Sequence, residues 1–234
     1  MRTPTLFVEN AAIGLQLLDH DETHYARTVL RATVGDRVLA VDGRGSQVRG
    51  ALEDAPGRRL AVRVDSVAAS PRPTPLVVLL GLPRPALVDE ALQLGTEAGL
   101  TELWLCRTEF SPPGQPRLDR LDRVARAACR QCRRESFPEI RVFEGLSEAL
   151  SALDATPSLA MAARFYGSPG ASPPALGSSA PAVVAVGPEG GFSLAEQQLL
   201  DECRFLAITL GPHILRAPTA VAVASAILGL NRSR

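Results

Sequence analysis

The sequence predicts an α/β protein with a small β-rich domain over residues 1–70 and a larger domain over residues 76–234 that contains a mostly parallel sheet. Two observations predict this fold class. Short strand patterns separated by turns fill the first 67 residues, whereas apolar strand-like runs alternate with helix-like segments after residue 75. The stretch between them, residues 68–75, carries three prolines and indicates a stiff linker.

Composition restricts the functional classes open to the chain. All 25 basic residues are arginine, which excludes lysine-dependent chemistry such as Walker-type nucleotide sites and Schiff-base catalysis. The formal net charge is zero, which argues against a uniformly positive surface but leaves room for a local basic patch. Every apolar run is shorter than a membrane span and the first residues lack a signal-peptide core, so we expect a cytoplasmic protein.

The elements of the first domain follow from its turn residues. Residues 22–30 have the pattern of a short helix, and residues 37–41, 47–52 and 60–67 have the pattern of strands. The sequence Asp-Gly-Arg-Gly at residues 42–45 and the pair Pro56-Gly57 predict the turns between these strands.

The elements of the second domain alternate in type. Continuous apolar runs predict strands that are covered on both faces. The expected strands are residues 76–82, 102–106, 140–143, 159–163, 182–186 and 205–210, and the expected helices are residues 85–98, 117–135, 146–154, 193–203 and 218–230. Residues 166–181 are rich in glycine, serine and proline and indicate a mobile loop.

The expected helix at 117–135 is rich in arginine. Its arginines fall on one side of a helical wheel and its apolar residues on the other. Seven arginines against three acidic residues leave a surplus of four positive charges, which suits either a solvated face or a phosphate backbone. Cys129 and Cys132 in this helix are interpreted as packing residues rather than a metal or redox site, because no second pair of ligands accompanies them.

Two glycine-bearing loops near the C-terminus indicate a small-molecule pocket. Residues 187–193 (GPEGGFS) and 211–216 (GPHILR) each follow a strand pattern and precede a helix pattern. Glycine allows a ligand to approach the main chain closely, and a strand-to-helix turn presents free N–H groups. Ser193 and Glu196 match a capping box, so we assign them to the helix start rather than to catalysis. Glu189 has no such structural explanation, and Pro218 suits the first turn of the last helix.

The paired sequences GPEGGFS (187–193) and LGPHILRAPTA (210–220) resemble the signature of the RsmE-type ribosomal RNA methyltransferases of the SPOUT superfamily. The likeness continues through MRTP (1–4), residues 24–31, VDG (41–43), EAG (97–99), AACRQC (127–132) and PEIR (138–141). Members of this family methylate N3 of a uridine in 16S ribosomal RNA with S-adenosylmethionine, during ribosome biogenesis. The resemblance therefore implies a PUA-like β-barrel that binds RNA, a SPOUT domain with a deep trefoil knot, and a homodimer that needs no metal or membrane.

The resemblance also implies roles for individual residues. Arg216 matches the second arginine of the signature, and we expect it to be the catalytic residue that stabilises the uracil oxygens as negative charge develops. The residues expected to bind the cofactor are Met161, Gly187, Pro188, Glu189, Gly190, Gly191, Leu210, Gly211, Ile214, Leu215 and Thr219. The residues expected to bind RNA are Arg2, Arg31, Arg123, Arg126, Arg130, Arg133, Arg134 and His213. The general base is not identifiable from the sequence.

Two alternatives stay open at this point. The family pattern has arginine where this chain has His213, and Glu-Thr where it has Pro218-Thr219. A cofactor-binding but catalytically weak ribosome-assembly protein is therefore one alternative. The other is a SPOUT methyltransferase that acts on transfer RNA.

Overall fold

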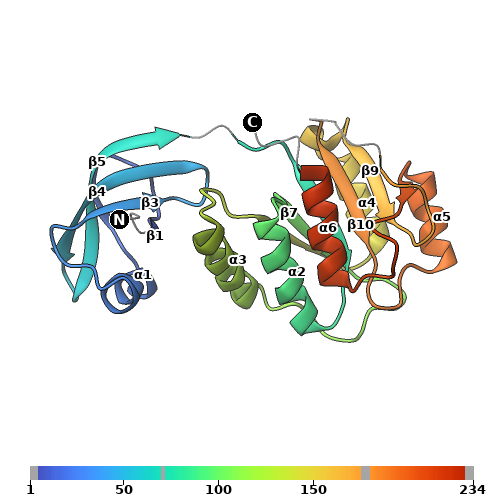
Figure 1. The fold of residues 1–234 in the computed structure, drawn as a ribbon, viewed down its shortest axis with the longest axis horizontal. Helices are drawn as coiled ribbons and strands as arrows, with labels where there is room; N and C mark the ends of the chain where they lie inside the picture. Colours follow the sequence, from blue (N-terminus) through green and yellow to red (C-terminus); the bar gives the residue numbers. More distant parts are fainter. Residues whose placement is uncertain (1–4, 70–71, 175–179, 230–234) are drawn as a thin grey trace. The chain divides into compact units, whose positions relative to one another are not determined.

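The computed structural model describes residues 5–69, 72–174 and 180–229, which fall into two compact units (Figure 1). The first unit contains residues 1–72 together with 129–137, and the second contains residues 73–128 and 138–234. The sequence-based division assigned residues 129–137 to the second domain, whereas the structure groups them with the first. The reason is local: Phe137 N–H donates to the Gly43 carbonyl (2.8 Å) and Gly45 N–H donates to the Glu135 carbonyl (3.2 Å).

The first unit is a five-stranded sheet with one short helix. Its strands are β1 (Thr5–Phe7), β2 (Gly14–Leu17), β3 (Arg37–Val41), β4 (Ser46–Ala55) and β5 (Arg59–Ala69), and its helix α1 (His20–His24) continues into a π-helical turn (Tyr25–Val29). The strand order is β1-β3-β4-β5-β2, with β1 parallel to β3 and the other pairs antiparallel. The predicted strands are present, and β4 and β5 are longer than expected. The sequence missed β1 and β2, which are only three and four residues long.

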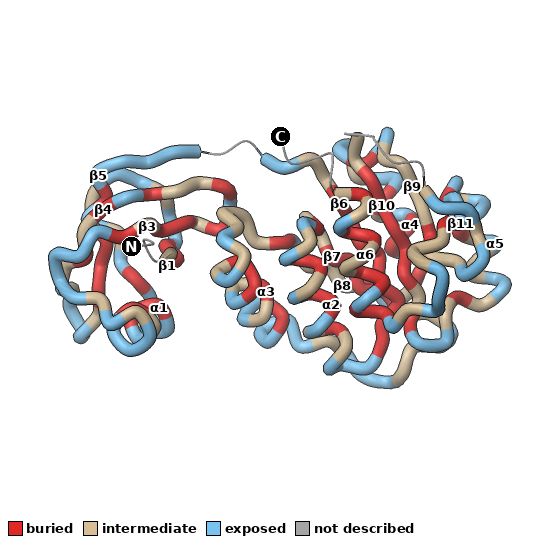
Figure 2. The backbone as a smooth tube through the Cα atoms, viewed as in Figure 1, coloured by how far each residue is buried: buried red, intermediate tan, exposed pale blue. Residues whose placement is uncertain are grey.

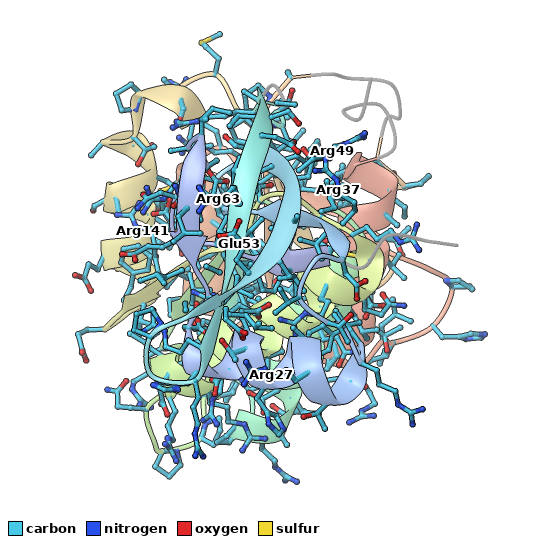
Figure 3. All side chains as sticks on the ribbon, turned by 90° about the vertical axis from the view of Figure 1, so that its left-hand side faces the viewer. Arg27, Arg37, Arg49, Glu53, Arg63 and Arg141 are labelled. Atoms are coloured by element: carbon cyan, nitrogen blue, oxygen red, sulfur yellow. The ribbon has the colours of Figure 1, made fainter. Side chains whose placement is uncertain are left out.

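Alternation along these strands decides which residues form the core of the first unit. Val48, Leu52 and Val62 are fully buried, whereas Arg49 and Arg63 point outward and are exposed (Figure 3). Two exposed arginines of this unit have carboxylate partners: Arg63 pairs with Glu53 at 2.5 Å, and Arg37 of β3 pairs with Asp65. Asp19 caps α1 by accepting the Glu22 N–H at 2.7 Å, which fixes the start of the helix.

The second unit is a six-stranded sheet in which every paired strand is parallel. Its elements are β6 (Leu76–Gly81), α2 (Pro85–Glu97), β7 (Glu102–Cys106), α3 (Leu118–Cys132), β8 (Glu139–Phe143), α4 (Leu146–Asp154), a 3-10 turn (Pro157–Leu159), β9 (Ala163–Gly167), β10 (Ala182–Val186), α5 (Leu194–Glu202), β11 (Leu206–Ile208) and α6 (Ala217–Gly229). The last four residues of α3, 129–132, group with the first unit. The strand order is β11-β9-β10-β6-β7-β8. The α/β class and the parallel sheet are confirmed. The knot expected from the family resemblance stays a prediction.

Helices cover both faces of this sheet, which explains the uninterrupted apolar strands. Val78 and Leu80 of β6 pack toward α2 and α6, which lie side by side (Figure 1), while Val77 and Leu79 pack toward α4 and α5. Both β6 and β10 are buried along their whole length (Figure 2). Among the described residues, no helix has the length and apolar content needed to cross a membrane.

One predicted strand was misplaced by four residues. The sequence placed a strand at 159–163, but Pro157–Leu159 forms a 3-10 turn with Leu159 fully buried, and β9 runs from Ala163 to Gly167. Two features hid β9. It contains Arg164, which pairs with Asp154 at 2.6 Å, and its end overlaps the glycine-rich and proline-rich stretch that suggested a loop. Residues 175–179 of that loop lie outside the described residues.

Candidate active site

A cavity of about 360 Å³ lies at the carboxyl ends of β9, β10 and β11, where parallel α/β sheets usually bind ligands. The loop after each of these strands contributes to its wall. The lining residues are Tyr166, Gly167, Ser168, Pro169, Val186, Gly187, Pro188, Glu189, Gly190, Gly191, Phe192, Gln197, Thr209, Leu210, Gly211, His213, Ile214, Leu215, Ala217 and Ala220. Both glycine-bearing loops singled out in the sequence therefore meet at one cavity.

The loop after β10 is a tight turn that requires glycine. Gly191 N–H donates to the Pro188 carbonyl at 2.9 Å, and Gly191 has φ +75°, a conformation that L residues rarely adopt. A Cβ on Gly187 would lie 2.8 Å from the Gly191 carbonyl carbon, so the two ends of the turn touch. Immediately after the turn, Ser193 caps α5, which confirms the predicted capping box with Glu196.

The loop after β11 is held by one side-chain and one main-chain hydrogen bond. Thr209 Oγ1 donates to the Gly211 carbonyl at 2.8 Å, and Ser168 N–H donates to the Ile208 carbonyl at 2.9 Å. Leu210 packs over Gly167, where a Cβ would lie 3.3 Å from Leu210 Cδ1. The loops after β9 and β11 are thus tied together on one side of the cavity.

Most of the predicted cofactor residues line the cavity, and two do not. Met161 has a side chain that is 87% exposed in the segment before β9, and it is absent from the cavity wall. Thr219 is exposed on α6, whereas its neighbours Ala217 and Ala220 line the cavity.

Sequence reasoning missed the wall supplied by the end of β9. Burial raises the pKa of the Tyr166 phenol, and nearby Asp201 adds to the rise. Ser168 and Pro169 follow it in the wall. The available signal was Gly167, which directly follows Phe165 and Tyr166.

Charged residues surround the cavity on the side of α2. Arg84, which precedes α2 and is 81% exposed, pairs with Glu189 at 3.8 Å. Arg216 is 68% exposed and pairs with Glu90 of α2 at 3.8 Å. Arg216 is not part of the cavity wall, but Leu215 and Ala217 on either side of it are. Arg216 is therefore next to the cavity wall in the sequence, and its guanidinium is open to solvent and only loosely paired.

The arginines of α3 are less free than the sequence suggested. Arg123 pairs with Asp119 at 3.4 Å and Arg126 pairs with Asp122 at 2.9 Å, each one helical turn apart. A further carboxylate comes from α2, since Asp89 pairs with Arg120 at 2.5 Å. Counting charges along α3 alone therefore overestimated the positive surplus of this face.

Arg130 has partners inside the first unit and Arg134 is partly buried, while the RNA contacts expected of both stay predictions. Arg130 pairs with Glu22 of α1, and its guanidinium lies 3.9 Å from the Tyr25 ring centroid and 4.7 Å from that of Phe7. Burial lowers the pKa of Arg134, because a charged group is disfavoured away from water. A wheel cannot reveal this, because the partners of Arg130 come from the far end of the sequence.

The remaining predicted RNA residues are placed differently from one another. Arg31 is exposed with φ +53°, Arg133 is exposed with φ +62° at the end of α3, and His213 lies in the cavity wall. Arg2 lies outside the described residues. Cys129 is fully buried and packs with Phe7, Val41 and Phe137, in agreement with a packing role. The described residues contain no cluster of side chains that could hold a metal ion.

Comparison with known families identifies this arrangement. A family model described as an RNA methyltransferase domain matches residues 70–229, and a second, described as an RNA methyltransferase PUA domain, matches residues 18–65. The chain belongs to the RsmE-type family of RNA methyltransferases. It is 29% identical to the ribosomal RNA small subunit methyltransferase E of Mycobacterium bovis, over 94% of this chain and 88% of the relative. The enzyme of the same name from Synechocystis is also 29% identical, over 88% of this chain and 69% of the relative.

Solved structures of RNA methyltransferases share the fold. A probable rRNA-methyltransferase from Porphyromonas gingivalis superimposes with a TM-score of 0.83 at 25% identity, covering 98% of both chains. A ribosomal RNA small subunit methyltransferase E from Neisseria gonorrhoeae, solved with bound S-adenosyl methionine, gives the same TM-score and identity over 96% of both chains. The family likeness therefore extends through both units.

Proposed function

We propose that this protein transfers a methyl group from S-adenosylmethionine to N3 of a uridine in 16S ribosomal RNA. The observation that carries the proposal is the meeting of both signature loops at one cavity, in a chain that belongs to an RNA methyltransferase family. The relatives named for the small ribosomal subunit support 16S RNA as the substrate. The choice of uridine N3 comes from the resemblance of the two loops to the family signature.

The cavity suits S-adenosylmethionine in size and chemistry. A volume of about 360 Å³ falls in the range of small-molecule sites, and glycine-rich turns let a nucleoside approach the backbone. Leu210, Ile214 and Leu215 offer apolar wall, while Glu189 offers a carboxylate. The cofactor carries no phosphate, so the absence of lysine is no obstacle. When bound, it supplies an activated methyl group for displacement by a nucleophile.

Arg216 is the residue to which we assign catalysis. Methylation at N3 requires the uracil to lose a proton, and the charge that develops lies on its two oxygens. A guanidinium stabilises such charge with paired N–H donors, because its fork matches two acceptor atoms. Arg216 is exposed beside the cavity, and its 3.8 Å separation from Glu90 leaves its donors available to a substrate.

The first unit is proposed to bind RNA and the second to form a homodimer. A match to a PUA domain model over residues 18–65 supports the RNA-binding role. Ile214, in the cavity wall, is 86% exposed and Leu194, at the start of α5, is 85% exposed. Exposed apolar side chains beside a cavity are typical of a surface that a second subunit covers. We expect this work to take place in the cytoplasm.

The proposal is tested by transfer of labelled methyl groups. Purified small ribosomal subunits and 16S RNA from a deletion strain are incubated with the protein and labelled cofactor, and the modified nucleoside is identified by mass spectrometry. We expect N3-methyluridine in 16S RNA. Labelling of transfer RNA, and not of 16S RNA, would show that transfer RNA is the substrate and would contradict the proposal. Binding of cofactor and subunits without any transfer would favour the weakly catalytic assembly protein, for which His213 and Pro218 are the motivating residues.

A further inference from the structure

The loop after β7, residues 107–117, is folded on itself beside the cofactor loop. The Arg107 guanidinium donates to the carbonyl of Pro112 at 3.1 Å and also to that of Gly114. Thr108 N–H donates to Ser111 Oγ at 3.1 Å, and Ser111 N–H donates back to the Thr108 carbonyl at 3.0 Å. These bonds hold the tip of the loop, Glu109 and Phe110, in one conformation.

Contacts with three elements fix this loop against the cavity. Glu109 N–H donates to Glu196 Oε1 at 2.8 Å, so the capping residue of α5 also anchors the loop after β7. At the end of β6, a Cβ on Gly81 would lie 2.7 Å from Pro188 and 3.0 Å from Thr108, so Gly81 lets both loops close over it. A Cβ on Gly190 would lie 2.8 Å from Phe110 Cβ. Phe110 therefore packs directly on a glycine that lines the cavity.

The fold leaves this aromatic side chain half open to water. Phe110 is 49% exposed although its backbone is tethered on both sides. The residue before Gly190, Glu189, pairs with Arg84, which is itself 81% exposed. An open aromatic ring and an open guanidinium thus contact consecutive residues of the cofactor loop. Stacking on a base and pairing with a phosphate are the two contacts by which proteins hold single-stranded RNA.

We propose that Phe110 is a positioning residue on which an unpaired RNA base stacks, either the target uracil or its immediate neighbour. The proposal rests on the proposed function, and it adds a specific contact that sets the base beside the methyl group. Phe110 acts by orienting the base, and no bond to it forms or breaks. The ring is held in advance by the loop, so little conformational freedom is lost when the base arrives.

Two substitutions of similar bulk separate stacking from simple packing. Phe110→Leu keeps an apolar side chain on Gly190 but removes the aromatic face, whereas Phe110→Tyr keeps the face. We expect Phe110→Leu to lower kcat/KM for RNA by about 5- to 150-fold, the range that loss of one base–aromatic stack gives. Phe110→Tyr retains activity within about twofold. Leu118→Ala removes another exposed apolar side chain (55% exposed) and serves as a control without effect.

The same variants are measured for cofactor affinity by calorimetry and for subunit association by light scattering. We expect both to equal those of the unsubstituted protein. Equal methylation by Phe110→Leu and the unsubstituted protein overturns the inference. A parallel loss of cofactor affinity overturns it as well, because Phe110 would then only shape the cavity wall, and dissociation of the dimer would assign Phe110 to the subunit contact. If the unsubstituted protein itself methylates no ribosomal RNA, the proposed function fails rather than the role of Phe110.

Discussion

Replacing Arg130 tests whether the ion pair with Glu22 stabilises the first unit. Glu22 is 6% exposed at its side chain, and Oε2 accepts the Phe7 N–H at 3.0 Å while Oε1 accepts from Arg130. In Arg130→Met the carboxylate loses its charged partner inside the protein. Removing one member of a buried pair costs about 3–5 kcal/mol, and the partial exposure of Arg130 (22%) places the expected loss near the lower limit, at about 3 kcal/mol.

The stability lost in Arg130→Met is expected to be larger at neutral pH than at acidic pH. Burial raises the pKa of Glu22 above its ordinary value of 4.5, and Arg130 opposes that rise. Without Arg130 the pKa of Glu22 rises further, so folding at neutral pH must bury an unpaired charge or take up a proton. The loss of stability in Arg130→Met is therefore complete at pH values above the raised pKa of Glu22 in the folded protein. It shrinks as the pH falls toward 4.5, where Glu22 is increasingly protonated in the unfolded chain too.

The assay is amide hydrogen exchange of β1 and β3 at pH 7, read by mass spectrometry. A loss of about 3 kcal/mol accelerates exchange through unfolding by about 150-fold. Arg123→Met is the matched control, because Arg123 pairs with Asp119 on the exposed face of α3 at 3.4 Å and should cost at most about 0.5 kcal/mol. The double variant Glu22→Gln with Arg130→Met should recover part of the loss. Equal exchange rates in Arg130→Met and Arg123→Met would refute the reasoning.

Three further outcomes are expected. Gly187→Ala should weaken S-adenosylmethionine binding at least tenfold by calorimetry, because the added Cβ would lie 2.8 Å from the Gly191 backbone. The control Gly145→Ala, where a Cβ would meet no atom within 4 Å, should bind normally. Equal affinities of the two variants would contradict the role of Gly187. Arg216→Ala should lower kcat by about 100-fold with cofactor affinity unchanged, and unaltered turnover would remove its proposed role. Burial raises the pKa of the Cys106 and Cys129 thiols to about 12, so iodoacetamide at pH 8 should leave both unmodified in the folded protein, and labelling as rapid as in urea would argue otherwise.

The sequence predicted most of the second unit because its strands are buried on both faces. Continuous apolar runs locate β7 and β10 at their observed bounds, and strong turn signals locate β3. Prediction failed where a strand was short or polar. β1 and β2 are too short to show the alternation of apolar and polar residues that predicts a strand. β9 contains Arg164, which interrupts its apolar sequence and which the fold accommodates by pairing it with Asp154.

The candidate site was predictable in its loops and not in its surroundings. The close backbone approach at position 187 and the positive φ at position 191 require glycine, so these features are visible in the sequence. The contacts of Phe110 with Gly190 and of Arg130 with Glu22 join residues that are 80 and 108 positions apart. Such pairs are set by the topology of the chain, so neither periodicity nor local composition indicates them.

The grouping of residues 129–137 with the first unit has a consequence for biosynthesis. Phe7 and Val41 complete their cluster only with Cys129 and Phe137, which the ribosome adds after more than half of the protein has been made. Domains that emerge first usually fold first. Here the main core of the leading domain lies within residues 6–64, but the Phe7–Val41 cluster is completed only by the late segment. A polypeptide that stops at residue 72 would therefore have an uncovered apolar patch.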